Sequence, residues 1–516
     1  MALPDGVTSL GNDAFQFCRA LTSISFPTSL ASLGNGVFHG CEKLTEISLP
    51  DGLKTIGSDA FADCRNLITL SLPDTISFIG RNAFSDCINL TNFSFPASLT
   101  SVEASCFYNC QSLTEISLPE GLTFIGHSAF ADCSQLANIT LPDSLACIGD
   151  RAFENCTQLQ HLTLPESLAI MGNEIFASCR RLASVEISPQ SLHFTSLAGV
   201  LFTKSLETLV LYPPGKPETP YTLPDGILTI REEAFKGATK LTNITLPESI
   251  TKIGKSAFED CQNLITINLP DNIKSIGSYA FAHCENLLAI SLPDELTMIE
   301  EYLFFQCQNL TNATLPDNLI SIGRGAFENC QSLTSISLPE GLESIGTSAF
   351  KHCESLDLVT LPSSLISLED SAFSDCESLT QINIPNRIST IASRTFYNCF
   401  RLSSISFPDS LTSIESSAFS YCFRLQSISL PEGLTSIGHS AFQYCYNLTS
   451  ISLPSSLTSI GISAFWRCRE LATIFFAGPP PNIEYNPFPE ISPQANLYVL
   501  PEHAPAFDDN ITLRNG

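Results

Sequence analysis

The chain has 516 residues, of which 25 are Lys or Arg and 52 are Asp or Glu, so its formal net charge at pH 7 is −27. This charge argues against nucleic acid or an anionic membrane surface as the partner, because both require a basic surface. Hydrophobic residues make up 44 %, too many for a disordered acidic chain, but no run approaches the ~20 apolar residues of a membrane span and no signal-like segment opens the chain.

A period of 23 residues organises nearly the whole sequence. Pro recurs at this spacing from Pro4 to Pro165 and from Pro224 to Pro454, giving 8 and 11 copies, and each copy also contains a Phe. A Cys follows three residues after that Phe, except in the ninth copy, where Ala238 takes the position; 18 of the 20 cysteines belong to this series. Because one copy cannot bury its own apolar residues, we expect the copies to stack as coils around one continuous core.

Each copy predicts the same elements in chain order. The alternation in Ile451-Ser-Leu453 indicates a short strand, which ends at Pro454 because proline has no backbone N–H. Leu-Pro-Asp-Gly, as at 49–52, predicts a type I turn with Pro second and Gly fourth. A second extended piece follows, as at 457–460, and the spacing of Ala, Phe and Cys in 464–468 then favours one short helical turn.

The residue after the second Ile of the copy is Gly in 13 copies. The other six copies hold Glu103, Arg231, Glu300, Glu369, Ala392 and Glu415. A backbone position with positive φ would rarely accept those residues. We therefore expect ordinary backbone there, with Gly selected because it leaves room.

The register divides the chain into 1–188 (repeat block 1, 8 copies), 189–223 (an irregular coil or hairpin insertion), 224–474 (repeat block 2, 11 copies) and 475–516 (a C-terminal cap that loses the Phe and Cys positions). In the insertion, 206–211 imitates a strand, and Val200-Leu201-Phe202 could pair with it as a protruding hairpin. Both a longer coil that keeps the core continuous and a hinge or docking loop fit this pattern. The chain begins in mid-coil at Leu3-Pro4, so we expect an upstream part, a removed segment or a poorly protected first coil.

The consensus L-x-x-I-x-L-P-x-x-L-x-x-I-G-x-x-A-F-x-x-C resembles the BspA-like leucine-rich repeat family. The likeness covers about residues 1–475, and the segments 199–204 with 211–216, and 476–481 with 497–501, resemble the family's irregular coil and its C-terminal end. The resemblance implies a leucine-rich-repeat solenoid of about 19–20 coils, with a parallel β-sheet face and short extended or helical turns on the other face. It also implies binding or adhesion at a bacterial or protozoan surface, without catalytic residues.

The cysteines show no CxxC pair and no zinc-ligand spacing. Neighbouring copies would place them ~5 Å apart, which does not exclude disulfides. Every copy uses Cys equally, however, and pairing would draw the coils together two by two. We therefore predict reduced thiols buried in the core.

Two further rows recur along the repeats. Asp or Glu follows the repeat Pro in 14 of 19 copies, which predicts an acidic ridge that serves solubility or binds cations or a cationic partner. Ser or Thr follows the first Ile in 15 of 19 copies, which predicts a hydroxyl row that is either soluble strand filler or a glycan- or ice-binding surface.

Catalysis finds no support in the sequence. The eight His are scattered over different repeat positions, and no nucleophile elbow, phosphate loop or metal-ligand motif occurs. We therefore expect no catalytic, cofactor-binding or metal-binding residues and no cofactor.

Aromatic residues and arginines gather beside the Cys of the last four copies. Among the two residues on each side of that Cys, these copies hold seven aromatics, whereas the first fifteen copies hold three: Phe17, Tyr108 and Phe305. This composition is enriched at binding hot spots. We call the set the aromatic–arginine strip: Tyr397, Phe400, Arg401, Tyr421, Phe423, Arg424, Tyr444, Tyr446, Trp466, Arg467 and Arg469. It is expected to be an exposed site for a partner or for self-association; the alternatives are packing beneath the C-terminal cap and sequence drift without a role.

These observations favour a non-enzymatic protein-binding or adhesion module, at the cell surface or secreted. An intracellular interaction scaffold or effector is one alternative, so a cytoplasmic location stays open, and a glycan- or ice-binding hydroxyl-rich surface is another. The expected ligand is a protein or a glycan, without nucleic acid and without a transmembrane segment, and the oligomeric state is left open.

Overall fold

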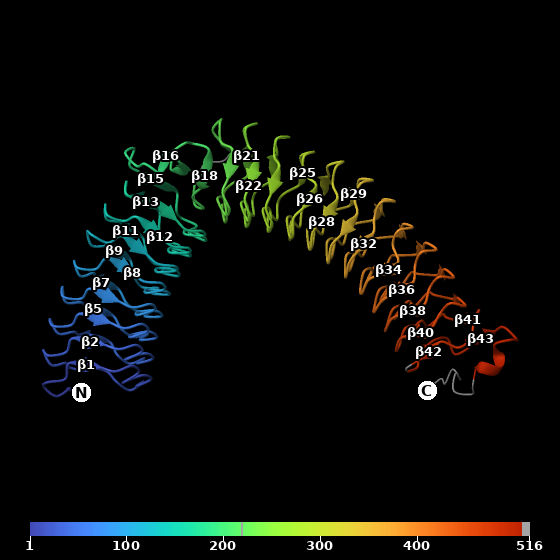
Figure 1. Ribbon diagram of the computed structural model, residues 1–516, viewed down its shortest axis with the longest axis horizontal. Helices are drawn as coiled ribbons and strands as arrows, with labels where there is room; N and C mark the ends of the chain where they lie inside the picture. Colours follow the sequence, from blue (N-terminus) through green and yellow to red (C-terminus); the bar gives the residue numbers. More distant parts are fainter. Residues whose placement is uncertain (218–219, 484, 508–516) are drawn as a thin grey trace. The chain divides into compact units, whose positions relative to one another are not determined.

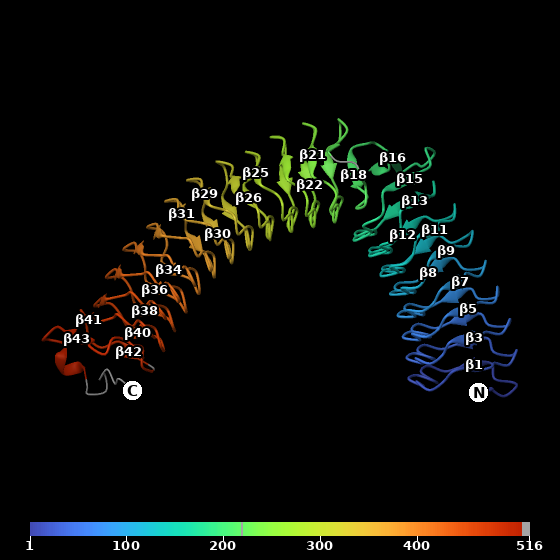
Figure 2. The same ribbon diagram turned by 180° about the vertical axis from the view of Figure 1, so that it is seen from behind.

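The computed structural model describes residues 1–217, 220–483 and 485–507. It divides into two units, one made of Met1–Leu241 with Ala257–Cys261 and the other of Thr242–Ser256 with Gln262–Gly516. Within each unit the coils follow one another in chain order, and each coil contributes strands to parallel sheets (Figures 1 and 2). Both units are therefore β-solenoids, which confirms the predicted stack of coils.

Most coils contain a leading strand before the repeat Pro and a trailing strand after it. In the first unit the leading strands are β3 (Glu46–Ser48), β5 (Thr69–Ser71), β7 (Asn92–Ser94), β9 (Glu115–Ser117), β11 (Asn138–Thr140), β13 (His161–Leu164), β15 (Ser184–Ile187) and β19 (Tyr221–Thr222). Its trailing strands are β1 (Ser9–Leu10), β2 (Ser32–Leu33), β4 (Thr55–Ile56), β6 (Phe78–Ile79), β8 (Ser101–Val102), β10 (Phe124–Ile125), β12 (Cys147–Ile148), β14 (Ile170–Met171) and β20 (Thr229–Ile230).

The second unit repeats this arrangement. Its leading strands are β21 (Asn243–Thr245), β23 (Thr266–Asn268), β25 (Ala289–Ser291), β27 (Asn312–Thr314), β29 (Ser335–Ser337), β31 (Leu358–Thr360), β33 (Gln381–Asn383), β35 (Ser404–Ser406), β37 (Ser427–Ser429), β39 (Ser450–Leu453), β41 (Thr473–Phe476) and β43 (Asn496–Val499). Its trailing strands are β22 (Lys252–Ile253), β24 (Ser275–Ile276), β26 (Met298–Ile299), β28 (Ser321–Ile322), β30 (Ser344–Ile345), β32 (Ser367–Leu368), β34 (Thr390–Ile391), β36 (Ser413–Ile414), β38 (Ser436–Ile437), β40 (Ser459–Ile460) and β42 (Asn482–Ile483). A short 3-10 helix, η1 (Ala504–Ala506), follows β43.

The predicted helical turn around the repeat Phe is wrong. Two consecutive tight turns take its place, and in a typical coil Asp59 and Asp63 have positive φ angles of 57° and 58°. The Phe61 N–H donates to Ala83 of the next coil at 2.8 Å, while the Cys64 N–H closes its own turn on the Phe61 carbonyl at 3.2 Å. Alternate N–H groups thus bond outside the coil, which a helix does not allow. Asp, Asn and Ser tolerate the left-handed conformation this requires.

The turn after the leading strand also differs from its prediction, by one residue. The Leu53 N–H donates to the Pro50 carbonyl at 3.0 Å, so the turn begins at Pro rather than at the residue before it. The glycine prediction, by contrast, is confirmed. Gly57 has no positive φ, and a Cβ on it would lie 2.5 Å from the backbone of Gly34 in the preceding coil.

Stacked phenylalanines fill the core. In the first unit the rings from Phe15 to Phe176 follow one another at 5.3–5.7 Å between centroids, and in the second unit those from Phe281 to Phe465 do so at 5.1–5.9 Å. Most of these side chains have no exposed surface. Offset or parallel stacking at this distance adds about 0.5–1.5 kcal/mol per pair beyond simple burial.

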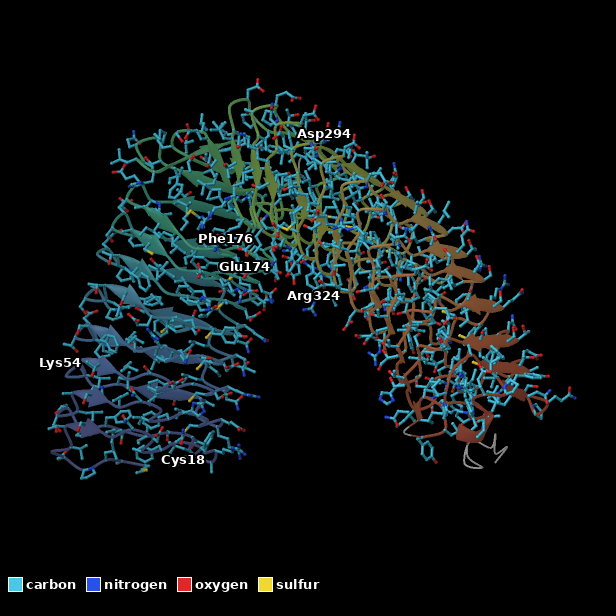
Figure 3. All side chains as sticks on the ribbon, turned by 45° about the vertical axis from the view of Figure 1, so that its right-hand side comes forward. Cys18, Lys54, Glu174, Phe176, Asp294 and Arg324 are labelled. Carbon is cyan, nitrogen blue, oxygen red and sulfur yellow. The ribbon has the colours of Figure 1, made fainter. Side chains whose placement is uncertain are left out.

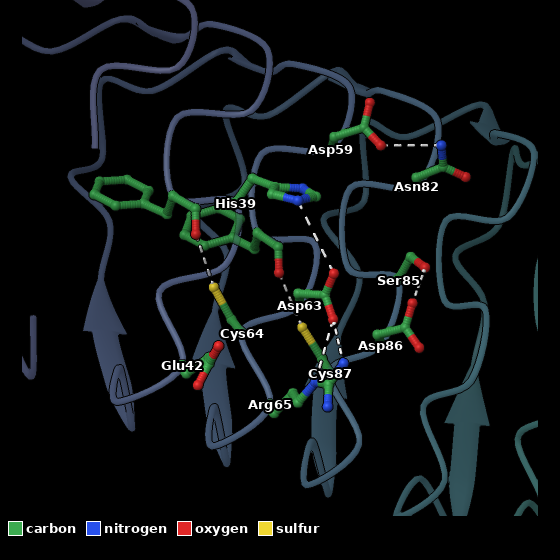
Figure 4. A network of polar contacts seen from close by, with 12 residues as sticks. His39, Glu42, Asp59, Asp63, Cys64, Arg65, Asn82, Ser85, Asp86 and Cys87 are labelled. Carbon is green, nitrogen blue, oxygen red and sulfur yellow. Dashed lines mark hydrogen bonds and ion pairs between the residues drawn. The ribbon is translucent and has the colours of Figure 1, made fainter. Parts of the chain in front are cut away.

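The repeat cysteines are free thiols, as predicted, and all but Cys18 are buried. Buried repeat thiols donate hydrogen bonds to the carbonyl of the Phe in the preceding coil, as from Cys64 to Phe38 and from Cys87 to Phe61, both at 3.2 Å (Figure 4). Burial raises the pKa of the Cys133 thiol to about 12, so it stays protonated. The Cys position therefore joins neighbouring coils without covalent bonds.

The irregular segment forms an additional coil. β17 (Val200–Thr203) pairs antiparallel with β16 (Phe194–Leu197) and with β18 (Thr208–Leu211), so the predicted hairpin pairing is confirmed. Its predicted protrusion is wrong, because Val200, Leu201 and Phe202 are fully buried. Tyr212 occupies the Phe position and stacks on Phe235 at 4.9 Å, which extends that ring stack by one coil.

An ion-pair cluster joins the coils on either side of this segment. Glu174, which shares its coil with Phe176 (Figure 3), accepts hydrogen bonds from Arg151 and from Lys236. Glu233 lies beside them with a positive φ of 61°, and its Oε2 atom is buried without a hydrogen-bond partner. Burial, with repulsion from Glu174, raises the pKa of Glu233 from its ordinary value to about 7.

The C-terminal region continues the stack, contrary to the predicted loss of the Phe and Cys positions. Phe488 stacks on Phe465 at 5.1 Å and stands 23 residues after it, and Ile491 fills the Cys position as a buried residue. The strands β42 and β43 pair in parallel with β40 and β41. We missed this coil because Ile replaces Cys, although the register of Phe is unbroken.

We predict that native protein presents very few reactive thiols. Cys18 is exposed and Cys147 is partly covered, whereas the buried thiols are shielded and have raised pKa values. A thiol reagent at about pH 8 should react promptly at Cys18, slowly at Cys147, and with all 20 cysteines after denaturation without reductant. A denatured count markedly below 20 would show disulfides and contradict the structure.

We also predict that Glu233→Gln stabilises the first unit in a pH-dependent way. The folded protein holds the proton of Glu233 more tightly than the unfolded chain, so this residue costs stability as the pH rises from about 4.5 to about 7. The variant should therefore melt at a higher temperature than the parent at about pH 8 and at nearly the same temperature at about pH 4. Equal differences at both pH values would refute this assignment.

Candidate interaction surface

The aromatic–arginine strip lies on the double turns of four consecutive coils in the second unit, those of Phe396, Phe419, Phe442 and Phe465. These four phenylalanines point into the core and stack on one another. Flanking residues of the same turns point outward, so the strip shares its backbone with the core without belonging to it.

The rings form two columns. In the first column, Tyr421 and Tyr444 stack at 4.5 Å between centroids, with Tyr397 against the edge of Tyr421 at 5.3 Å. Trp466 extends this column beyond Tyr444 at 5.4 Å. In the second column the Phe423 ring lies between those of Phe400 and Tyr446, at 6.5 Å and 5.0 Å. Edge contacts such as Tyr444–Tyr446 at 5.8 Å join the columns into one surface.

Two arginines cover the C-terminal end of the columns. The Arg467 guanidinium lies 5.4 Å from the Tyr444 centroid and 5.1 Å from that of Trp466, and Arg469 lies 5.2 Å from that of Tyr446. Such cation–π contacts contribute about 0.5–1 kcal/mol each at exposed sites. The shared repeat position was enough to predict that these residues are neighbours. It was not enough to predict that the arginines stack on the rings.

The cap reaches the strip at its last coil. Glu490 accepts hydrogen bonds from Trp466 Nε1 at 3.2 Å and from Arg467 Nε at 2.8 Å. The hydrogen bond from Arg467 holds the pKa of Glu490 below its ordinary value. The seven aromatic residues are half-buried rather than exposed as expected, while Arg401, Arg424 and Arg469 are exposed.

Three strip residues occupy unfavourable backbone conformations. Tyr421, Tyr444 and Arg467 have φ angles of 65°, 61° and 60°. At the same repeat position the other coils place mostly Asp, Asn or Gly, which adopt positive φ more readily. Ordinary side chains in this region cost about 1 kcal/mol or more each, and such residues concentrate at functional sites.

A second aromatic cluster in the same unit escaped the sequence analysis. Tyr279 and Tyr302 stack at 4.9 Å, Phe305 meets the edges of Tyr302 and His283, and Arg324 lies 5.9 Å from the Tyr302 centroid. Its two tyrosines stand two residues before the core Phe, outside the window around Cys that we compared. Extending that window to the first of the two turns would have found them.

The hydroxyl row lines a groove on the leading strands of the first unit. Ser48, Ser71, Ser94 and Ser117 lie along this groove, which has a volume of about 750 Å³, with carboxylates such as Glu46 beside them. The row is thus a structural feature, whereas glycan or ice binding stays a prediction. The fourteen acidic residues after the repeat Pro are all exposed.

A sequence model described as "BspA type Leucine rich repeat region (6 copies)" matches residues 1–114, 100–211, 218–333, 297–422 and 367–494. A search of curated proteins gives no significant match. Solved structures similar to the chain include a leucine rich cell surface protein from Faecalibacterium prausnitzii, with 26 % identity, a TM-score of 0.50 and coverage of 68 % of this chain and 82 % of that one.

Two further structures belong to leucine-rich repeat proteins. The protein from Bacteroides ovatus has 30 % identity and a TM-score of 0.42, with coverage of 74 % of this chain and 83 % of that one. The protein from Eubacterium ventriosum has 20 % identity and a TM-score of 0.41, with coverage of 68 % and 88 %. In the described part of the chain, no helix is both long enough and apolar enough to cross a membrane.

We predict that Tyr444→Asn destabilises the second unit less than Tyr446→Asn. Each variant removes one stacked ring, but only position 444 has a positive φ, which Asn adopts readily in other coils such as at Asn398. The difference in unfolding free energy should be about 1 kcal/mol in favour of Tyr444→Asn, measured by urea denaturation. An equal or larger loss in Tyr444→Asn would show that the backbone at Tyr444 is unstrained.

Proposed function

The chain belongs to the BspA-type leucine-rich repeat family, and on that basis we propose that it is a non-enzymatic protein-binding module whose contact surface is the aromatic–arginine strip. Proteins of this family and fold are typically protein-interaction modules. The observation that supports this surface most directly is the left-handed backbone of Tyr421, Tyr444 and Arg467. Other coils hold residues better suited to this conformation, so stability does not explain the aromatics and the arginine.

The composition of the strip supports a protein partner. Tyr, Trp and Arg are the residues that dominate binding energy at protein interfaces. The rings are already fixed by stacking, so binding would cost little side-chain entropy. Because the exposed arginines give the strip local positive charge on a chain of net charge −27, we propose an acidic contact surface on the partner.

We propose that the protein acts at the cell surface or after secretion. The support is that the similar protein from Faecalibacterium prausnitzii is described as a cell surface protein. Protease treatment of intact source cells, followed by detection with an antibody, tests this location. Loss of the protein from intact cells is expected, and full protection until the cells are lysed would contradict the proposal.

Binding is tested with a photo-crosslinking amino acid in place of Tyr446, used to capture a partner from source cells, followed by affinity measurement with the purified partner. The double variant Tyr421→Ser with Phe423→Glu should weaken binding at least about tenfold, because it removes two central rings. Ser178 and Glu354 occupy the same repeat positions in other coils, so the fold should tolerate both replacements.

A matched control replaces two exposed apolar residues of the same unit outside the strip, Leu358→Glu with Tyr498→Ser, whose side chains are 49 % and 51 % exposed. This control should bind like the parent. If both double variants bind equally well while remaining folded by circular dichroism, the strip is not the contact surface.

A further inference from the structure

The coils next to the strip place acidic residues where the strip places aromatic ones. Glu354 and Glu377 directly follow the repeat Cys in the two coils that precede the strip. In the next two coils this position holds aromatic rings, with Arg401 and Arg424 one residue further on. Four consecutive coils of the second unit therefore present two acidic and then two basic side chains, at adjacent positions of the same turn.

These charges lack ionic partners within the described residues. No ion pair there involves Arg401 or Arg424, both of which are exposed, and none involves Glu377. The Glu354 carboxylate accepts a hydrogen bond from the neutral Gln331 at 3.2 Å. Partial burial and repulsion from Glu354 raise the pKa of Glu377, so this acidic pair gains from a cation brought from outside.

The geometry of the rings limits what can bind beside them. Phe423 and Tyr444 each have neighbouring rings on both faces, and Tyr446 has Phe423 on one face and Arg469 on the other. What these three rings leave available to a partner is the ring edge, which is the electropositive part of an aromatic ring. Edges favour carboxylates and apolar side chains, whereas flat stacking of sugars or bases needs free faces. An acidic partner surface therefore fits both these ring edges and the exposed arginines beside them.

The chain itself presents such a surface. We propose, on the basis of the proposed protein-binding function of the strip, that it binds a second copy of this chain through a two-fold axis between the coils of Phe373 and Phe396. A two-fold rotation reverses the order of the coils in the second copy. The two acidic coils of one copy therefore face the two basic coils of the other. Arg401 then faces Glu377 of the second copy, and Arg424 faces Glu354 of the second copy. The rings in the coils of Phe396 and Phe419 of each copy then meet the two acidic coils of the other copy.

The expected interface is small and the dimer weak. With strands about 4.8 Å apart, the four charged coils span roughly 15 Å. The same two-fold axis pairs the last strip coil, that of Phe465, with the coil of Phe304, so the whole contact extends over roughly 34 Å. Interfaces of this size lie at the low end of specific protein contacts. The net charge of −27 on each copy further opposes association. We therefore expect a dimer that forms reversibly at micromolar or higher concentration.

Sedimentation velocity over a range of protein concentrations at physiological salt tests the proposal. The parent protein should shift from monomer to dimer. Arg424→Glu and Glu354→Arg should each weaken dimerisation at least about tenfold, because each creates like-charge contacts at two symmetric places. The protein with both changes has the charges exchanged, so its dimer should recover to within about threefold of the parent. Lys274→Glu, at an exposed position on β24's coil, makes the same change in charge and should dimerise like the parent.

The sedimentation results distinguish the second copy from other partners. A parent protein that stays monomeric up to about 0.5 mM overturns the second copy as partner, since specific contacts at the low end of size would show by then. Dimerisation that survives Arg424→Glu, or that the combined exchange fails to restore, places the contact elsewhere. Binding of a different protein through the strip would remain measurable in each case, so the proposed function fails only if the strip variants leave every interaction unchanged.

Discussion

Hydrogen bonding between coils at the double turn determines the rest of the structure. Each turn sends alternate backbone N–H groups to the next coil, as from Phe350 to Ala372 at 2.8 Å, and closes itself with the others, as from Cys353 to Phe350 at 3.2 Å. This pattern requires left-handed residues on both sides of the core Phe, such as Ser348 and His352. It also fixes the direction in which that Phe enters the core, so ring stacking and thiol hydrogen bonds follow from it.

The same turn explains why surface residues can change without disturbing the core. The inward residues, such as Phe442 and Cys445, are fully buried, while the residues between and beside them face solvent. Tyr444 and Tyr446 thus occupy positions that other coils fill with Asp and Glu, and the core beneath is the same. The cost of a new surface is confined to local backbone conformation and to the charges exposed.

The period and the apolar pattern were sufficient to predict the coils, the buried Cys position and the contact between aromatic rings of neighbouring coils in the strip. Conformation at single residues was not accessible in the same way. The turn was mistaken for a helix because Ala, Phe and Cys have helical spacing, and the signal against it was the frequent Asp, Asn and Ser at positions such as Asp59 and Asp63. Tyr212 was missed as a core residue, and Phe488 as the start of another coil, because each departs from the consensus at a neighbouring position. Ring stacking and the contact of Glu490 with Arg467 depend on side-chain geometry, which no repeat pattern specifies.

The regular coils pair in a constant register of 23 residues, so their surface positions recur at even spacing along each unit. A gene rearrangement that removes or duplicates one whole repeat would shorten or lengthen a unit by one strand spacing, about 4.8 Å, and leave every remaining coil with suitable neighbours. Within the regular coils, a deletion whose length is not a whole number of repeats would move Phe442 and its equivalents out of register with their neighbours. Gain or loss of whole repeats can therefore change the distance between two surface patches in discrete steps. Residues within one patch can also vary, while the residues of the core remain under the same selection in every repeat.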